Sequence, residues 1–252
     1  LKSNALRTAY LGFNFKHPLL KQKEIREALS YGVQKDVITK YILKNLGQEA
    51  HSLLTPGSEY FLSGREKDLY NPEKAASLLD KAGYPVKAGQ KYRFTLKLTF
   101  PQNEIRYAVA RSLAADFERI GVKLETQTFE WGKFKTEVEK GRIDMWLLSW
   151  IGFKDPDIYR YVFSKKSFPP NGGNRGWYEN PELDFLLEKG SKTIILSERK
   201  KIYYDVQRIV AEDRPYLFLY HKDNTVVMRK EIEGYKIFAD GRYSSLVSVT
   251  KN

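Results

Sequence analysis

Hydrophobic and polar positions in the centre of the chain follow the periods of strands and helices in turn. Over 92–100, aromatic and leucine side chains alternate with Arg, Thr and Lys, which predicts a strand. Apolar residues then recur at helical spacing over 105–120, and a second strand is expected over 122–129. A short helix over 132–140 precedes a nearly continuous apolar strand over 144–150, which we expect to be buried on both faces. This order, with short connections, predicts parallel strands joined by right-handed crossovers.

The segments on either side carry helix-start signals and shorter strand-like patterns. Asn71-Pro72-Glu73 and Asn180-Pro181-Glu182 each combine a capping Asn, a Pro suited to the first helical position and an acid near the positive end of the helix dipole. The other expected elements are a strand over 8–15, helices over 22–31, 35–46 and from 197 to before 215, loops over 47–70 and 152–176, and strands over 217–220, 226–228 and 243–250. The predicted fold class is α/β, with a mixed, largely parallel sheet flanked by helices.

Composition and charge narrow the function classes. The 252 residues include no Cys, which excludes disulfide scaffolds, thiol catalysis and zinc–thiolate sites. The longest apolar stretch, over 145–153, is far shorter than the roughly 20 residues that a membrane-spanning helix needs. The net charge is +12, but no run of five like charges occurs, so we interpret the excess as a solvated basic surface. Binding to nucleic acid or to an anionic surface is kept as an alternative, although such proteins usually cluster their basic residues.

Sequence motifs for catalysis, metals or cofactors are sparse. His17, His51 and His221 share no local spacing with acids, so no metal site is expected, and no motif predicts a cofactor. Asp155-Pro156-Asp157 pairs two carboxylates near a strand end, where they can do acid–base work or bind calcium. Two acids that flank a Pro more often form a turn and cap the next helix. A hydrolase that uses Asp155 and Asp157 is therefore kept only as a second alternative.

Two tryptophans follow the expected carboxyl ends of strands. Trp131 comes directly after Glu130, and Trp150 directly after Ser149. In open α/β sheets this edge is where ligands bind, so both indoles are candidate ligand contacts. The alternative is that the indoles complete the hydrophobic core.

Taken in order, short motifs along the chain resemble the extracellular solute-binding proteins of the dipeptide, oligopeptide and nickel class, the receptors of ABC importers. The motifs carrying this resemblance are Tyr10-Leu11-Gly12-Phe13-Asn14, the segments 24–32, 34–36, 70–75 and 117–122, Glu130-Trp131, Gly141-Arg142-Ile143-Asp144, Ser149-Trp150-Ile151-Gly152 with Asp155-Pro156-Asp157, Asn174, and the segments 178–184 and 207–215. Each motif is weak alone, but together and in this order they cover nearly the whole chain.

The resemblance implies one lobe of a type II periplasmic-binding-protein fold, without enzymatic activity. Residues 1–14 are expected to be a strand segment that crosses the hinge, 15–215 the C-terminal ligand-gripping lobe, and 216–252 the returning hinge strands and C-terminal segment. The chain begins with Leu1 and has no apolar signal core, so it is expected to be the C-terminal part of a longer protein whose N-terminal lobe is absent here. The implied partners are a peptide or other small solute, that N-terminal lobe and the membrane subunits of an ABC importer, but no nucleic acid. The implied location is periplasmic or extracellular, at the membrane through the importer or a lipoprotein anchor outside this chain.

The resemblance also implies a set of ligand contacts. These are Trp131, Trp150, Gly152, Phe153, Asp155 and Asn174. Peptide-binding members often carry an acid soon after the Ser-Trp-x-Gly segment, where it pairs with the ligand's amino terminus. Here Phe153 occupies that place and Lys154 follows, so a cationic amine loses its counter-charge unless the loop turns Asp155 inward.

Overall fold

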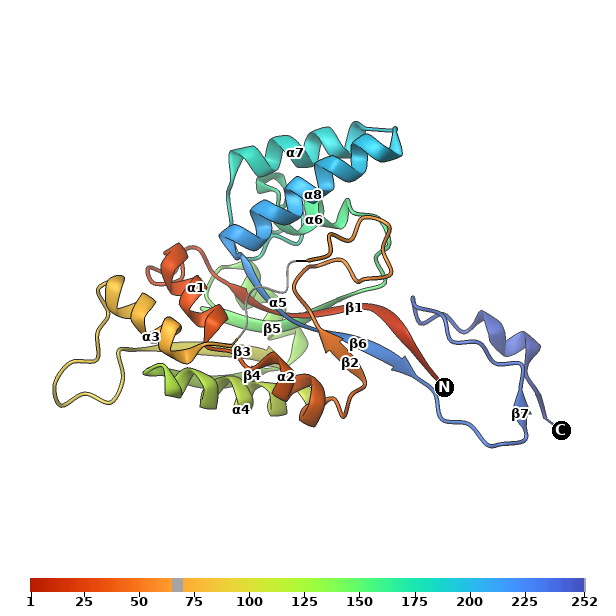
Figure 1. Cartoon of the computed structure of the whole chain (residues 1–252), viewed down its shortest axis with the longest axis horizontal. Coiled ribbons are helices and arrows are strands. Elements are labelled where there is room, and N and C mark those ends of the chain that lie inside the picture. Colours follow the sequence, from red (N-terminus) through yellow and green to blue (C-terminus); the bar gives the residue numbers. More distant parts are fainter. Residues whose placement is uncertain (65–69, 252) are drawn as a thin grey trace.

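A six-stranded mixed sheet forms the centre of the molecule. The computed structural model describes residues 1–64 and 70–251 (Figure 1). The strands lie in the order β2-β6-β1-β5-β3-β4. Their bounds are β1 Lys2–Phe13, β2 Gly47–Glu49, β3 Phe94–Pro101, β4 Val122–Phe129, β5 Met145–Ile151 and β6 Tyr216–Thr225. β3 pairs in parallel with β4 and β5, whereas β1 is antiparallel to β5 and β6, and β2 to β6. Strands β3 to β6 therefore run one way and β1 and β2 the other, which confirms the expected fold class.

Helices cover both faces of this sheet (Figure 1). One side carries α1 Lys23–Tyr31, α2 Lys35–Val37, the π-helical turn Ile38–Ile42, α3 Pro72–Lys81 and α4 Glu104–Arg119. The other side carries α5 Trp131–Glu139, α6 Ile158–Phe163, the 3-10 turn Lys165–Ser167, α7 Pro181–Lys192 and α8 Leu196–Asp213. Successive strand side chains point to opposite faces, so Leu11 and Phe13 enter the α4-side core while Tyr10 enters the α8-side core.

The helices and strands in the centre of the chain agree closely with those that the sequence pattern predicts. The expected strands and helices between 92 and 150 are all present, and their parallel arrangement is confirmed. The two Asn-Pro-Glu signals begin α3 and α7, where the side chains of Asn71 and Asn180 accept hydrogen bonds from the N–H groups of Lys74 and Leu183. In β5 the first four residues are buried, as the continuous apolar run predicts.

Several expected boundaries and two expected strands are wrong. Residues 226–228 form no strand, since β6 ends at Thr225 and Val227 is fully exposed with no neighbouring strand to pair with. Most of 243–250 is a 3-10 turn over Ser244–Ser248, and only the two-residue strands β7 Ile232–Glu233 and β8 Thr250–Lys251 pair there. The expected loop over 152–176 contains α6, and the expected loop over 47–70 contains β2. Residues 65–69 of that loop, and residue 252, lie outside the described residues.

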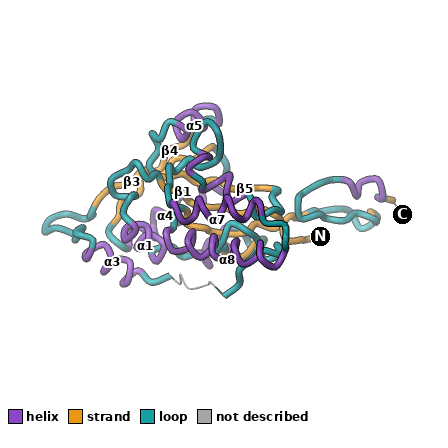
Figure 2. The backbone as a smooth tube through the Cα atoms, turned by 90° about the horizontal axis from the view of Figure 1, so that it is seen from above, coloured by secondary structure: helices purple, strands orange, loops and turns teal. Residues whose placement is uncertain are grey.

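The chain enters and leaves this fold at one end. Both termini lie at the same end of the molecule in two views at right angles (Figures 1 and 2). The amino group of Leu1 donates to the carbonyl of Val226 at 2.8 Å, and β1 pairs with β6 from Lys2 opposite Thr225 onward. Because β1 is antiparallel to β5, this end is also where β5 finishes, with Arg7 opposite Ile151.

The buried His221 makes the stability of this pairing depend on pH. His221 of β6 is the cross-strand neighbour of Thr8 of β1. The Thr8 hydroxyl donates to the carbonyl of Leu53 at 2.8 Å and accepts from the ring Nδ1–H at 2.9 Å. Burial, followed by the nearby charges of His51 and Lys35, lowers the pKa of His221 to about 4. The unfolded chain therefore takes up a proton on this ring before the folded protein does as the pH falls.

We expect the free energy of unfolding to fall by about 3 kcal/mol as the pH drops from about 6.5 to about 4, through His221 alone. Urea denaturation at a series of pH values measures this slope. In the His221→Asn variant, which retains an N–H donor toward Thr8, the slope over this interval should be shallower by that amount. An unchanged slope in the variant would show that other groups cause the acid sensitivity.

Candidate ligand-binding site

Trp150 lies at the carboxyl end of β5 within a group of aromatic and basic side chains. Its ring is stacked with Tyr10 (6.3 Å between centroids, 9° between planes) and meets Tyr161 edge-on at 5.8 Å. The guanidinium carbon of Arg175 lies 5.2 Å from the centre of the indole. Burial raises the pKa of Tyr10, and the charge of Arg175 opposes that rise. A Cβ at Gly173 would lie 2.8 Å from both Trp150 and Tyr161, so only glycine allows the backbone to pass this close to the two rings.

The segment after Trp150 turns back against β1. Gly152 has a φ of +80°, which favours glycine, and its N–H donates to the carbonyl of Leu6 at 2.8 Å. Phe153 is half-buried and packs against the α8-side core. Lys154 is exposed and pairs with Asp240 at 3.3 Å. The turn therefore connects the end of β5 to the start of β1 and to the C-terminal segment.

Asp155 is held by an arginine from a distant helix. Arg199 of α8 donates to its two carboxylate oxygens at 2.8 and 3.2 Å, and the N–H of Asp157 donates to one of them at 2.8 Å. Burial disfavours the ionised form, but these hydrogen bonds outweigh it and lower the pKa of Asp155. Asp157 accepts from the hydroxyl of Tyr203 and lies 3.3 Å from Arg199. Both carboxylates thus anchor the segment before α6, in agreement with the expected turn, and neither is placed as a free acid–base group. The expected capping is not seen, since the Asp157 side chain accepts no hydrogen bond from the first turn of α6.

A cavity of about 360 Å³ opens beside this turn. Its lining residues are Leu6, Gly57, Ser58, Glu59, Tyr60, Lys154 and Ala239. The hydroxyl of Tyr60 accepts from Arg199 at 3.1 Å, so the Asp155–Arg199 pair supports one wall. The volume suits a small solute or one residue of a longer one.

Trp131 lies on the same edge but apart from Trp150. It is the first residue of α5, 52% exposed, and is stacked on Phe134 at 5.9 Å. Strand β3 separates β4, which precedes Trp131, from β5. Two strand spacings of about 4.8 Å therefore lie between the two strand ends. A ligand that touches both indoles must extend along the sheet edge.

Asn174 is placed inside the fold rather than on its surface. The side chain is 2% exposed. Its Nδ2 lies 2.8–3.1 Å from the carbonyl oxygens of Phe163, Ser164 and Tyr178, and its Oδ1 accepts from the N–H of Tyr178 at 3.2 Å. Asn174 therefore positions the loop that carries Gly173 and Arg175 against Trp150.

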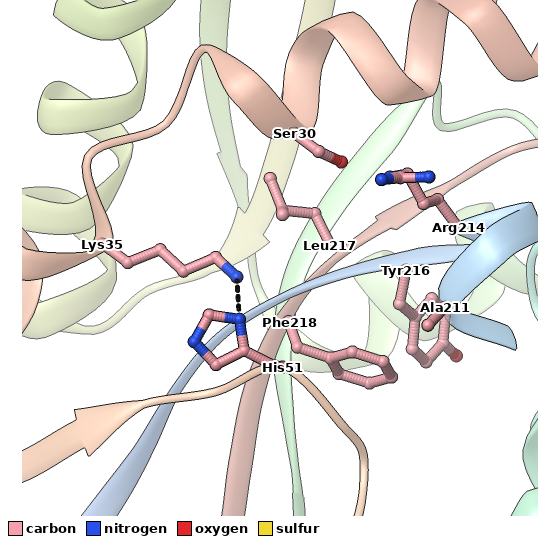
Figure 3. A pocket seen from close by; sticks show the side chains of 8 residues that line it. All are labelled: Ser30, Lys35, His51, Ala211, Arg214, Tyr216, Leu217 and Phe218. Atoms are coloured by element: carbon pink, nitrogen blue, oxygen red, sulfur yellow. Dashed lines mark hydrogen bonds between the residues drawn. The ribbon is translucent and has the colours of Figure 1, made fainter. Parts of the chain in front are cut away.

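A second, smaller pocket lies near the start of β6 (Figure 3). Its lining residues are Ser30, Lys35, His51, Ala211, Arg214, Tyr216, Leu217 and Phe218, and the Lys35 ammonium lies 3.4 Å from Nδ1 of His51. At about 30 Å³ it has room for water but not for a solute. Within residues 1–64 and 70–251, no three His, Cys, Asp or Glu side chains gather so as to hold a metal ion.

The sequence patterns did not reveal the basic and supporting residues of this edge. Arg175, Tyr60 and Arg199 come from three separate segments, and only folding brings them to the turn after β5. Gly173 packs closely against Trp150 and Tyr161. Its position one residue before Asn174, which belongs to the resembling motifs, was the one available signal.

Comparisons with known proteins identify one family, and the chain covers only part of the length of its relatives. The model of "Bacterial extracellular solute-binding proteins, family 5 Middle" matches residues 1–170. The oligopeptide-binding protein AppA of Bacillus subtilis is 32% identical over 247 residues, which are 92% of this chain and 44% of that protein. The chain thus spans less than half the length of this curated relative. The relatives named are binding proteins, and none is named as an enzyme.

Solved structures give the same result for the fold. The chain superposes on AppA from Bacillus subtilis in complex with a nonapeptide with a TM-score of 0.88, at 26% identity, covering 100% of this chain and 52% of that one. It superposes on NikZ from Campylobacter jejuni in complex with Ni(L-His) with a TM-score of 0.87, also at 26% identity, covering 53% of that chain. None of the helices in the described part of the chain combines the length and apolar content needed to cross a bilayer.

Proposed function

This chain belongs to the bacterial extracellular solute-binding proteins of family 5, and we propose that it is one lobe of a receptor that captures a peptide-like or other small solute for an ABC importer. The observation that carries the proposal is the position of the Trp150 edge. The chain enters along β1 and leaves along β6 at the end of the sheet where β5 presents Trp150. The 360 Å³ cavity opens beside the turn that follows β5. A second lobe connected through these strands would face that edge.

We propose domain boundaries on the basis of this arrangement. Residues 1–14 and 216–252 would form the hinge-crossing segments, with β1 and β6 lying in the sheet of this lobe and leading out of it toward the other lobe, and residues 15–215 would grip one side of the solute. The antiparallel pairing of β1 with β6 supports this, since two paired strands can bend together as a hinge. Closure would bury the solute between the lobes, driven by contacts that only the closed form makes.

The ligand contacts we propose are Trp131, Trp150, Gly152, Phe153 and Asp155, with Asn174 as a positioning residue. Trp150 offers a partly exposed indole at the end of β5, and Gly152 presents exposed backbone beside it. Asp155 would keep its pair with Arg199, which supports the Tyr60 wall of the cavity. No catalytic step is assigned to Asp155 or Asp157, so we propose a receptor without enzymatic activity. We propose its place outside the cytoplasmic membrane and its docking to importer subunits on the basis of family membership alone.

A peptide titration of the chain tests this proposal. We expect trialanine and a nonapeptide of alanine and serine to bind only weakly, since one lobe supplies half of the contacts. Trp150→Ala should weaken binding at least about five-fold by removing an aromatic contact. Phe185→Ala, which removes an exposed aromatic ring on α7 away from the edge, should leave it unchanged. Chemical-shift changes in a labelled chain measure both effects, with thermal melts as the folding control. Equal loss in the two variants, or no binding at all, would contradict the proposal.

A further inference from the structure

Three consecutive apolar side chains are exposed at the turn between α7 and α8. These two helices lie side by side, and the turn closes the outer end of the pair (Figure 1). Ile194 is 95% exposed, Ile195 59% and Leu196 47%, and we call these three residues the hairpin tip. Turns between helices normally carry polar residues, and a run of three exposed apolar residues adds nothing to the core. The hairpin tip therefore indicates a contact with something outside the chain.

The hairpin tip also departs from the usual start of a helix. Ile195 occupies the capping position of α8, and its side chain cannot accept a hydrogen bond from the first turn. Helices α3 and α7, by contrast, are each capped by an Asn side chain. An apolar residue at this position gives up the stabilisation that a polar cap provides. Two local rules are thus broken at one point, which is typical of a functional surface rather than of a structural turn.

Hydrogen bonds hold the hairpin tip in place. Arg199 donates from Nε to the carbonyl of Gly190 at 3.1 Å, which connects the start of α8 to the end of α7. The same guanidinium donates to Asp155 at 2.8 Å, in the turn after β5. The hydroxyl of Thr193 donates to the carbonyl of Lys189 at 2.8 Å. The apolar side chains are therefore presented on a supported frame beside the turn after β5, so little conformational freedom is lost when they meet a partner.

Lysines surround the hairpin tip. The nearest along the two helices are Lys189 and Lys192 in the last turn of α7, and Lys200 and Lys201 in the second turn of α8. At 1.5 Å of rise per residue, each lies within about 8 Å of the turn along a helix axis. Lys192 pairs with Glu188 at 2.7 Å, and within residues 1–64 and 70–251 the other three form no ion pair. Their long side chains can place ammonium groups beside the apolar residues.

Positive charge is in excess around the hairpin tip. Against the four lysines stand two acids, Glu188 and Glu198, while Arg199 and Asp155 neutralise each other. The whole chain carries a net charge of +12. Anionic lipid headgroups would therefore attract the chain as a whole, and the hairpin tip supplies the apolar residues that would fix its orientation.

A bilayer suits this combination of residues better than a protein partner does. A stable protein interface buries roughly 800 Å² on each partner, far more than three side chains supply. Lysine is also depleted at the centre of protein interfaces. At a bilayer, by contrast, isoleucine and leucine side chains enter the boundary between headgroups and acyl chains, while lysine ammonium groups remain among the phosphates.

We propose that the hairpin tip inserts into the surface of a bilayer that contains anionic lipid, with the four lysines bound to lipid phosphates. Binding is weak and reversible, since only three apolar side chains enter the bilayer. The turn after β5, which Arg199 connects to the end of α7, would then lie close to the membrane surface. This role requires neither a solute nor a second lobe.

Vesicle sedimentation tests the proposal on the whole chain. The probes are sucrose-loaded vesicles of phosphatidylcholine, with and without about 30% phosphatidylglycerol, and we expect at least about ten-fold tighter binding to the anionic vesicles. The double variant Ile194→Ser, Ile195→Ser should weaken this binding about five-fold or more, without lowering the melting temperature, because both side chains are exposed. Val227→Ser is the matched control, since it removes a fully exposed aliphatic side chain from the C-terminal segment and should leave binding unchanged.

Charge variants separate the hairpin from the net charge of the chain. Lys200→Gln combined with Lys201→Gln should weaken binding to the anionic vesicles about ten-fold. Lys135→Gln combined with Lys140→Gln removes the same charge from exposed positions on and after α5, and should weaken binding less than about two-fold. Equal weakening by the two pairs would mean that the net charge adsorbs without a defined orientation, which would overturn the proposal.

A fluorescent label measures insertion directly. The chain has no Cys, so Ile195→Cys and Val227→Cys each provide a single thiol for an environment-sensitive dye. On anionic vesicles we expect the emission of the dye at position 195 to shift to the blue, and that of the dye at position 227 to stay unchanged. A shift at both positions or at neither would overturn the proposal, as would the absence of sedimentation with either vesicle. The proposed solute capture would be unaffected by these results, since the peptide titration tests it without lipid.

Discussion

Replacing Arg26 by Met is expected to lower the free energy of unfolding by about 3–5 kcal/mol. Arg26 lies in α1 and is 3% exposed. Its guanidinium donates to the carbonyl oxygens of Leu20 at 2.8 Å and Lys21 at 2.9 Å, before α1, and to those of Asp213 at 2.6 Å and Arg214 at 3.1 Å, at the end of α8. Methionine fills much of the space but leaves these carbonyl groups without a donor.

Arg26 connects the segment before α1 to the end of α8 mainly through hydrogen bonds to backbone carbonyl groups. Burial lowers the pKa of Arg26 to about 10, and the Asp213 carboxylate only partly opposes this effect. The guanidinium carbon also lies 4.3 Å from the ring of Phe15. The planar guanidinium has enough N–H groups to reach both places at once, and a lysine ammonium does not. Arg26→Lys should therefore also lower the free energy of unfolding, although it retains the positive charge.

Urea denaturation with linear extrapolation measures these losses. Arg111→Met is the matched control, since Arg111 is exposed on α4 and its removal should change stability by less than about 0.5 kcal/mol. A loss below about 1 kcal/mol for Arg26→Met would mean that water replaces the guanidinium at these carbonyl groups.

Arg26 also illustrates what the sequence could and could not predict. Its helix and the helices after Asn71 and Asn180 were predictable, because caps and periodicity act within a few residues. The partners of Arg26 at the end of α8 lie nearly 190 residues further along the chain. No local pattern encodes such a contact. Likewise, the antiparallel placement of β1 between β5 and β6 depends on long-range pairing, which periodicity does not specify.

In the candidate site, too, local sequence patterns predicted some residues, whereas others depend on contacts between distant segments. The rule that ligands bind at strand carboxyl ends led to Trp150, and the structure places it, Gly152 and Asp155 along one edge. Their role in binding a solute stays a prediction. Arg199, which holds Asp155, carried no signal, since an isolated arginine in a sequence rich in basic residues looks like any surface charge. Its partial burial and its pairs with Asp155 and Asp157 distinguish it only in three dimensions.

Replacing Asn174 by Ala is expected to lower the free energy of unfolding by about 2–4 kcal/mol and to weaken solute binding as a consequence. The amide is the common partner of the carbonyl groups of Phe163, Ser164 and Tyr178 and of the Tyr178 N–H, so its removal leaves several buried polar groups unsatisfied. Asn171→Ala is the matched control, since Asn171 lies exposed in the same loop and its side chain makes no hydrogen bond within the described residues.

Stability and solute binding, measured together, decide the role of Asn174. Asn174→Asp should destabilise at least as much as Asn174→Ala at neutral pH, because a carboxylate would face three carbonyl oxygens. In both variants the indole N–H signal of Trp150 should shift, since the loop with Gly173 and Arg175 loses its support against that ring. If instead binding is lost while stability and the Trp150 signal stay unchanged, Asn174 contacts the solute itself. The loop must then open in the bound state, because in this structure the amide is enclosed by the backbone that it holds.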